Sequence, residues 1–561
     1  MNEAEIVIGL LAGVAFLGAV ARRAGLPYAP VLVIGGLVVG VIPGIPHIHL
    51  DPELVLLGFL PPLVYSAAFQ AASYDLRPNV VHILTLATGL VLLTVGTVAA
   101  TGHAIAALPW ASALVLGALA APTDPVSASS VMRDVGAPER IVAILEGESL
   151  INDGTGLAVF QVAVLAAGGG ISVASGVTHF IAISIGGSAV GLASGWILVR
   201  VRRRLDEPSL EIVLGLLAAF GSYVAAYAIG WSGVLAAVTA GLYAGRHAED
   251  ISSPGARINM EPFWDALTFV LESMLFLLIG LELPVIVSGL HGNLGDGILQ
   301  GVGVVAAAVA IRAAWMAALR IMPSGVGRGL AAAVERLLRF GRRWRGREEP
   351  PEGGEEASEG REERAEEEVL VEPLSGRELT VLGFSGMRGA LSLAGALSIP
   401  LTVGGHAFAG RDHVIFLVYV VVIGTLVLPS LTLERLVRRL GLALGDQLRR
   451  LDVHARTRIV HAGLARLEEL APDAGVPEAT LDRLRAVLEL RLERLDARTR
   501  RDGDGPEPET AEVEAAVRRL RQEVISAERA ALAELRQERR TPTQVLGRIQ
   551  HDIDLDEIRM H

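Results

Sequence analysis

The sequence predicts an all-α polytopic membrane protein with about 13 transmembrane helices, followed by a cytoplasmic helical tail. Three observations lead to this fold class. The chain of 561 residues is 51% hydrophobic, and its mean hydropathy of +0.47 is high for a soluble domain. Charged residues make up only 20% and gather in a few stretches. Glycine is abundant, with 63 residues, as expected where helices pack closely in a membrane.

The composition also excludes several classes of function. With no cysteine, the chain has no disulfide scaffold, thiolate metal site or cysteine nucleophile. All 49 basic residues are arginine, which excludes Schiff-base chemistry and a phosphate-binding loop lysine. The net charge of -12 does not suggest nucleic-acid binding. No nucleophile-base constellation indicates an enzyme, and we expect no cofactor.

Thirteen stretches are long and apolar enough to approach the roughly 20 residues that a membrane-crossing helix needs. The first begins with Asn2, Glu3 and Glu5 in place of the basic region of a cleavable signal, so we expect a retained helix. The candidate spans are Ile6–Val20, Val31–Ile42, Leu54–Phe69, Val80–Ala100, Ala111–Met132, Arg140–Ala167, Val177–Val199, Leu210–Ala228, Ser232–Ala244, Phe263–Ile286, Gly301–Ile321, Leu379–Pro400 and Val414–Leu436.

The distribution of arginine between the loops predicts the orientation. Counting from an external N-terminus, one set of loops carries most of the arginines, and the other set has essentially none before Arg411. The positive-inside rule then places the N-terminus outside and the C-terminus in the cytoplasm. The arginines on the predicted inner side are Arg22, Arg23, Arg77, Arg133, Arg140, Arg200, Arg202, Arg203, Arg204, Arg246, Arg257 and those after Arg320.

Two regions differ from the membrane domain, which we assign to residues 1–440. Residues 323–375 form a cytoplasmic loop that is first basic and then acidic, and the acidic part, from Glu348 to Glu368, is expected to be disordered. Residues 441–561 form a tail with leucine at helical spacing, as in LDRLRAVLELRLERL, and a break at Asp502–Pro508. The tail is either a solvated helical region or a dimerising or regulatory one.

The fifth span contains a predicted break at mid-membrane. It reads Ala121-Pro-Thr-Asp-Pro125, and both prolines lack a backbone donor and disfavour the preceding helical turn. An interrupted helix exposes backbone groups, which the membrane tolerates only around a cavity or protein partners. Broken helices at the midplane are typical of ion sites in transporters. Asp124 is therefore either an ion-site residue or a structural cap of a kinked helix.

The sixth span carries a polar cluster, EGESLINDGTG, from Glu146. Glu148 and Asn152 share one helix face, Ser149 and Asp153 share the next, and Asn152 and Asp153 differ by about 100°. Carboxylate, hydroxyl and amide oxygens are hard ligands that suit Na⁺, K⁺ or H⁺. A single carboxylate that holds either a proton or a cation, but not both, is sufficient for exchange.

Four segments together resemble the NhaP-type sodium/proton antiporters, bacterial relatives of the eukaryotic sodium/proton exchangers. They are TDPVSASS, EGESLINDGTG, GMRGALSLAGALSIP and LPPLVYSAAF, and the likeness extends over most of Gly9–Leu436. The resemblance implies a homodimer in the plasma membrane, with a core domain and a dimerisation domain. It also implies inverted repeats, two crossing unwound helices and elevator-type alternating access.

The resemblance assigns roles to five polar residues of the fifth and sixth spans. Asp153 corresponds to the essential cation/proton carboxylate and would bind Na⁺. Asn152 is the neighbour that replaces a second aspartate in electrogenic relatives. Thr123, Asp124 and Ser149 match positions that line or coordinate the ion. With one aspartate in the pair, the resemblance implies one-for-one, electroneutral exchange.

Glu148 resembles the acid that pairs with a core arginine in this family. Arg312 stands alone in the apolar stretch VVAAAVAIRAAWMAAL and is the first expected partner, because an unpaired arginine there is costly. Arg388, in the glycine-rich GMRG that resembles the second unwound helix, is the alternative. Either arginine can instead serve the fold alone.

Two positions depart from the family pattern. Many relatives have a glutamate in the third span where this chain has Ser66, so a cation ligand or gate is expected to be missing. Glu272 in TFVLESMLFLLIG is an extra acid, either a proton relay or a protonated donor to a backbone carbonyl. The expected function is Na⁺/H⁺ antiport; the alternatives are Li⁺ or K⁺ in place of Na⁺, and a non-transporting sensor or channel that signals through the tail.

Overall fold

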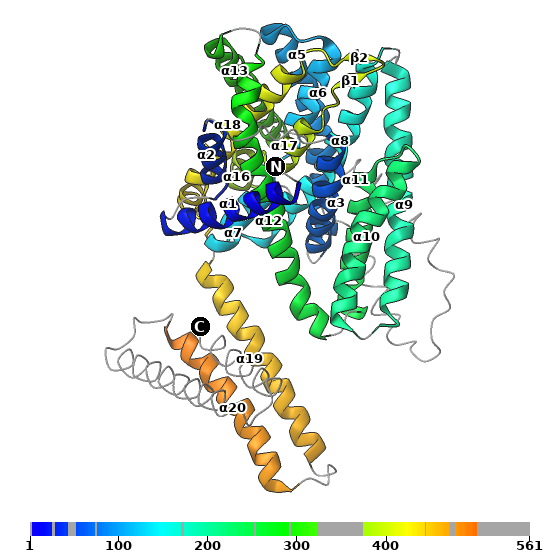
Figure 1. Cartoon of the computed structure of the whole chain (residues 1–561). Helices are drawn as coiled ribbons and strands as arrows, with labels where there is room; N and C mark the ends of the chain where they lie inside the picture. The colour runs from blue at the N-terminus through cyan, green and yellow to red at the C-terminus, as the bar shows by residue number, and fades with distance from the viewer. Residues whose placement is uncertain are drawn as a thin grey trace, which may run out of the picture. The chain divides into compact units, whose positions relative to one another are not determined.

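The computed structural model describes residues 3–24, 28–42, 52–72, 76–169, 173–205, 207–251, 254–290, 293–321, 374–443, 445–471 and 477–501. Within these ranges the chain is almost entirely helical (Figure 1), which confirms the predicted fold class. The chain divides into two compact units, Met1–Leu444 and Gly445–His561. The expected loop at 323–375 lies outside the described residues except at its last two positions.

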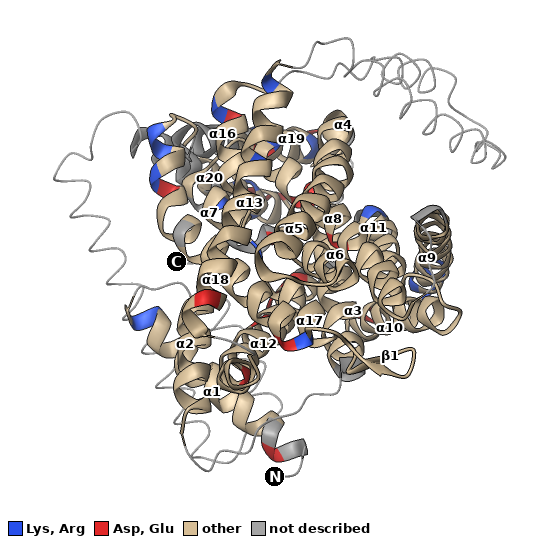
Figure 2. Ribbon diagram, turned by 90° about the horizontal axis from the view of Figure 1, so that it is seen from above, with Lys and Arg blue, Asp and Glu red and all other residues tan. Residues whose placement is uncertain are grey.

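Eight helices of the described chain are long and apolar enough to cross a membrane. Figure 2 shows that uncharged residues make up most of their ribbon. These helices are α1 (Glu3–Ala24), the continuous α4–η2–α5 (Val80–Leu84, Thr85–Leu90 and Val91–Ala106), α8 (Glu139–Ala167), α9 (Val173–Arg202), α10 (Pro208–Ala228), α12 (Pro254–Ser288), α13 (Leu294–Ile321) and α18 (Arg411–Arg439). The other apolar helices of this unit are α2 (Tyr28–Gly40), α3 (Pro52–Ala71), α6 (Trp110–Ala120) and α11 (Gly233–Ile251).

Two of the expected spans are interrupted halfway. The stretch 111–132 forms α6 and α7 (Pro125–Val135), with extended chain between them, because Pro122 and Pro125 cannot continue the hydrogen-bond ladder of α6. The stretch 379–400 forms α16 (Gly376–Phe384) and α17 (Ala390–Leu397), separated by Ser385–Gly389. Each half-helix therefore ends inside the apolar unit and leaves free backbone groups there.

A short hairpin follows α17. Strands β1 (Thr402–Val403) and β2 (His406–Ala407) pair in antiparallel register. Gly404 and Gly405 form the turn with φ of 60° and 82°, a conformation that a side chain disfavours. The hairpin returns the chain to α18.

The helices of the first unit pack in two groups. The scaffold group contains α1, α2, α3 and α9 to α12, in which α2 packs on α12 and α11 packs on α3 and α9. Figure 1 shows α9, α10 and α11 side by side on one flank. The core group contains α5 to α8, α13 and α16 to α18, in which α6 packs on α5 and α8, and α13 packs on α18. Both interrupted helices belong to the core group.

Small residues bring α2 and α12 into close contact. A Cβ atom on Gly36 would overlap the backbone of α12 at Leu277, and one on Gly280 would overlap the backbone of α2 at Val33. Helices in a membrane gain most of their association energy from such close packing. The pair α2–α12 is therefore a tightly packed part of the scaffold group.

The described part of the second unit is a pair of helices, α19 (Gly445–Leu470) and α20 (Glu478–Arg501). Val460 and Leu464 of α19 pack against Leu488 and Leu492 of α20. The leucine spacing of the tail forms this seam. The expected break at Asp502–Pro508 and the rest of the tail lie outside the described residues.

Candidate functional site

The two interrupted helices meet at their breaks. The backbone N–H of Asp124 donates a hydrogen bond of 2.7 Å to the carbonyl oxygen of Met387. Arg388, in the second break, donates from Nε to the carbonyl of Ala120 at the end of α6 and from Nη1 to the carbonyl of Gly386. The breaks therefore satisfy part of each other's free backbone groups, as a membrane interior requires.

Charged side chains lie at the ends of the four half-helices with the sign that each end favours. Arg388 and Arg312 bind carbonyls in the last turns of α6 and α16, at Ala120 and Leu382. Asp124 directly precedes α7, and its carboxylate lies against Gly389, the residue before α17. Helix C-termini attract cations and N-termini attract anions. Asp124 therefore lies where a carboxylate interacts favourably with both N-termini, beside the cavity described below.

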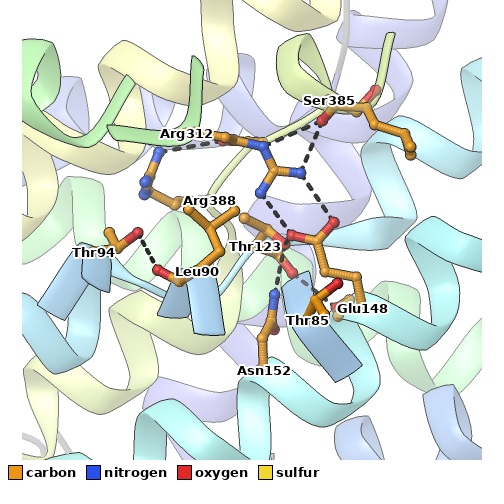
Figure 3. A network of polar contacts seen from close by, with 12 residues as sticks. Thr85, Leu90, Thr94, Thr123, Glu148, Asn152, Arg312, Ser385 and Arg388 are labelled. Carbon is orange, nitrogen blue, oxygen red and sulfur yellow. Dashed lines mark hydrogen bonds and ion pairs between the residues drawn. The ribbon is translucent and has the colours of Figure 1, made fainter. Parts of the chain in front are cut away.

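Glu148 of α8 and Arg312 of α13 form a buried ion pair. The Nη1–Oε1 and Nη2–Oε2 distances are 2.6 and 3.0 Å, and the two residues are only 1% and 5% exposed. Arg312 also donates from Nε and Nη2 to the carbonyl of Leu382. Figure 3 shows the guanidinium facing the Glu148 carboxylate.

Glu148 thus pairs with Arg312 and not with the alternative, Arg388, which donates to the backbone carbonyls of Ala120 and Gly386. The bidentate geometry gives Arg312 a charge-assisted partner that compensates for its burial.

Three polar residues brace the first break from α8. Asn152 Nδ2 donates to Thr123 Oγ1 at 2.7 Å, and Ser149 Oγ donates to the Thr123 carbonyl at 2.8 Å. Thr123 Oγ1 in turn lies 3.5 Å from Glu148 Oε1. Figure 3 shows this chain of contacts from Asn152 through Thr123 to Glu148. Ser149 and Asn152 are fully buried and do not line the cavity beside them, so they hold Thr123 in place.

A cavity of about 50 Å³ lies between the breaks and the scaffold group. The described residues that line it include three acids, Asp124, Asp153 and Glu272, and none that is basic. One water needs about 10–15 Å³ of such space, so the cavity can hold a cation with a few waters. Its lining residues are Leu63, Val64, Ala67, Pro122, Thr123, Asp124, Asp153, Glu272, Gly389, Ala390, Leu391 and Ser392.

The lining residues come from both groups of helices. Asp153 approaches from α8, beside the first break, and α3 and α12 supply the opposite wall. Ser66 is buried in α3 but does not line the cavity, whereas its neighbour Ala67 does. Acidic oxygens suit a hard monovalent cation or a proton.

Glu272 makes a contact that the sequence did not suggest. Its Oε2 accepts a hydrogen bond of 3.1 Å from the hydroxyl of Tyr28 on α2. Both expected roles of Glu272, a proton relay and a protonated donor to a backbone carbonyl, stay predictions.

Two glycines of the second break make close contacts that the sequence does not predict. A Cβ atom at Gly386 would lie 2.5 Å from Arg312 Cδ, and one at Gly389 would lie 2.5 Å from Asp124 Oδ2. In the sequence, the two glycines that flank Arg388 in GMRG are the feature that could indicate such close contacts. Only the fold shows which side chains approach them.

Comparison with known proteins agrees with this architecture. The family described as sodium/hydrogen exchanger, transmembrane, matches residues 10–439. An uncharacterised Na⁺/H⁺ exchanger of Mycobacterium tuberculosis is 30% identical over 579 aligned residues, which cover 100% of this chain and 98% of that protein. The Na⁺/H⁺ antiporter ApNhaP of Aphanothece halophytica is 29% identical and covers 92% of this chain and 89% of its own length.

A solved structure shares the fold. The sodium proton antiporter MjNhaP1 of Methanocaldococcus jannaschii at pH 8 superposes with a TM-score of 0.56, covering 78% of this chain and 99% of that one at 18% identity. The NhaP-type resemblance of the four sequence segments is thereby confirmed. The family match over residues 10–439 and the full-length similarity lead to one conclusion: this chain is a multi-pass membrane protein of the sodium/hydrogen exchanger family.

Proposed function

We propose that this protein exchanges Na⁺ for H⁺ across the plasma membrane, with Asp153 as the shared binding site. The observation that carries the proposal is the position of Asp153 in a small acidic cavity beside two interrupted helices. Membership of the exchanger family and the similarity to named antiporters support cation/proton exchange as the overall activity.

Competition at one carboxylate provides the coupling. A proton on Asp153 removes the negative charge that a cation needs, and a bound cation excludes the proton. Asn152, which carries no charge, is engaged with Thr123, and Asp124 lies at two helix N-termini. Asp153 then binds one proton or one monovalent cation in turn, which favours one-for-one, electroneutral exchange.

Alternating access follows from the division of the cavity wall. Asp153 belongs to the core group, whereas Leu63, Val64 and Ala67 of α3 belong to the scaffold group. Movement of the core group past the scaffold would carry the ion from one side of the membrane to the other, as in an elevator. The buried Glu148–Arg312 pair and the bonded breaks favour a core that moves as one body.

We further propose a homodimer, with the N-terminus outside and the C-terminus in the cytoplasm. The family resemblance supports the dimer, and the arginine-rich loops on one side support the orientation. The acidic cavity suits Na⁺, Li⁺ and K⁺ alike by ligand chemistry, so a cation screen is part of the test.

Exchange in proteoliposomes tests the proposal. A pH dye trapped inside should report a pH change when Na⁺, Li⁺ or K⁺ is added outside, and a voltage-sensitive dye should stay silent for electroneutral exchange. Asp153→Asn should abolish the pH change. Asp296→Asn, at an exposed aspartate of α13, is the matched control and should retain it. Full exchange by Asp153→Asn, or equal loss in the control, would overturn the assignment.

A further inference from the structure

We infer that Glu272 is a second ligand of the transported cation, which faces Asp153 from the scaffold side, and that Tyr28 positions it. This inference rests on the proposed function and deepens it. It differs from a proton relay, because a ligand contributes to the affinity for the cation. The argument uses the cavity, the Tyr28 hydrogen bond and the charge balance around Glu272.

Besides Asp124, the cavity presents two carboxylates to an ion. Asp124 also faces it, but this carboxylate lies against Gly389 at the N-termini of α7 and α17. Asp153 and Glu272 remain, one on the core group and the other on the scaffold group. Because Asp153 and Glu272 line the same cavity, a cation inside it meets a carboxylate from each group of helices.

The scaffold holds Glu272 in a defined position. The Tyr28 hydroxyl donates to Oε2 at 3.1 Å, and the Tyr28 ring packs edge-on against Phe269 and Phe276, with centroid distances of 5.5 and 6.4 Å. Phe269, Glu272 and Phe276 lie on one face of α12 by their spacing. The close packing of α2 on α12 fixes the two helices that carry these groups.

This arrangement resembles the support of a metal ligand by an outer hydrogen bond. The phenol occupies one oxygen, Oε2, and leaves Oε1 for the ion. Outer donors fix the orientation of a ligating carboxylate and tune its affinity. In this proposal Glu272 keeps one protonation state through the cycle, and the exchange stays one-for-one.

The charge balance distinguishes Glu272 from a structural acid. Glu148 is buried with Arg312 as its counter-charge, whereas Glu272 accepts a hydrogen bond from the neutral Tyr28, and none of the described residues that line its cavity is basic. A buried acid in a membrane is costly unless a positive charge compensates for it. The transported cation supplies that charge when it is bound.

The position of Ser66 agrees with this assignment. The α3 residues that line the cavity, Leu63, Val64 and Ala67, are apolar, so α3 offers no side-chain oxygen to the ion. Among the lining residues given by the described structure, Glu272 is the acid that the scaffold group contributes. In this proposal α12 thus supplies the acid that the third span lacks.

Sodium binding and exchange together test the inference. We expect Glu272→Gln to raise the half-saturating Na⁺ concentration about tenfold, in the range seen when groups around a metal site are removed, with a maximal rate within about twofold of wild type. The shift of the thermal midpoint by Na⁺ in detergent should shrink in parallel, since a ligand stabilises in proportion to its occupancy.

Variants at Tyr28 and Glu282 refine the test. Tyr28→Phe should raise the half-saturating Na⁺ concentration by about threefold in wild type and add nothing to Glu272→Gln, because it acts through Glu272. Glu272→Asp should recover part of the affinity. Glu282→Gln is the matched control, because Glu282 lies ten residues further along α12 and does not line the cavity; its affinity for Na⁺ should be unchanged.

The outcomes separate this inference from the proposed function. If Asp153→Asn abolishes exchange while Glu272→Gln lowers only the maximal rate at unchanged Na⁺ affinity, Glu272 is a proton relay and the inference is overturned. An equal loss of affinity in Glu282→Gln also overturns it. If Asp153→Asn retains exchange, the proposed function fails irrespective of Glu272. Should Glu272→Gln not fold, Glu272→Asp and Tyr28→Phe give the same readings.

Discussion

Asp124 and Gly389 lie so close together that a Cβ atom on residue 389 would come within 2.5 Å of the Asp124 carboxylate. They belong to different interrupted helices, and Asp124 also donates its backbone N–H to Met387 in the second break. One acidic side chain thus lies at the N-terminal ends of both α7 and α17, where the helix dipoles favour a negative charge.

This proximity predicts that Gly389→Ala separates the two breaks. Real Cβ atoms do not approach within 2.5 Å of other heavy atoms, so Asp124 or the α17 start has to move, at a cost of about 1–3 kcal/mol. We expect at least a tenfold loss of exchange in proteoliposomes and a lower thermal midpoint. Gly96→Ala in α5, where nothing lies within 4 Å of an added Cβ, is the control and should behave as wild type. Normal exchange by Gly389→Ala would contradict the predicted separation.

The Glu148–Arg312 pair predicts a large and non-additive effect on stability. Removing one partner leaves a buried charge without compensation, which costs about 3–5 kcal/mol, so Glu148→Gln and Arg312→Gln should each lower the thermal midpoint strongly. Combining Glu148→Leu with Arg312→Met should recover part of the loss, because neither charge remains.

An exposed pair provides the control for this cycle. Arg438 and Glu434 of α18 are 3.0 Å apart, with side chains 59% and 57% exposed. Arg438→Gln should therefore cost less than about 1 kcal/mol. If Arg438→Gln were as damaging as Arg312→Gln, burial of the pair would not explain its importance.

The sequence identified the polar residues of the site better than their contacts. Prolines at 122 and 125 predicted the first break, and the cost of a charge in an apolar span predicted that Arg312 needs an acid. Both predictions depend on local chemistry that a single segment contains. The pairing of Glu272 with Tyr28 spans 244 positions along the chain, and no periodicity links the two residues.

Ser149 and Asn152 illustrate the same limit from the opposite direction. Their spacing placed them beside Asp153 on α8, and the resemblance made them ion-lining residues. Both side chains donate to Thr123, whose carbonyl and hydroxyl face this side of α8. Whether a polar residue of α8 faces the cavity or the first break depends on how α8 is rotated relative to that break. The sequence of α8 alone does not determine this rotation.

The contact of Asn152 predicts the effect of a second acid at this position. An ionised aspartate has no N–H to donate to Thr123 and would stand close to Glu148, which Thr123 already approaches. Asn152→Asp should therefore lower the free energy of unfolding by about 1–3 kcal/mol and reduce exchange, rather than simply make it electrogenic. Thermal unfolding in detergent measures the first effect.

The control for Asn152→Asp is Asn293, whose side-chain oxygen accepts a hydrogen bond. Asn293 Oδ1 accepts from the backbone N–H of Gly295, and an aspartate preserves that bond. Asn293→Asp should keep the wild-type thermal midpoint. A fully stable Asn152→Asp with exchange that responds to membrane voltage would favour a direct role of this residue in the charge of the site.

Competition for Asp153 predicts how the Na⁺ requirement changes with pH. Protons occupy the carboxylate that Na⁺ needs, so the half-saturating Na⁺ concentration should rise as the pH falls. Linkage limits the slope to the number of protons displaced, and one proton gives at most a tenfold rise per pH unit. The measurement is initial exchange rate against Na⁺ between about pH 6 and 8.5, with equal pH on both sides of the membrane.

Asp296→Asn should reproduce the wild-type slope, because this exposed residue does not line the cavity. A half-saturating concentration that does not depend on pH would exclude a shared site, and a slope near two would show that a second carboxyl group, with Glu272 the first candidate, exchanges its proton in each cycle.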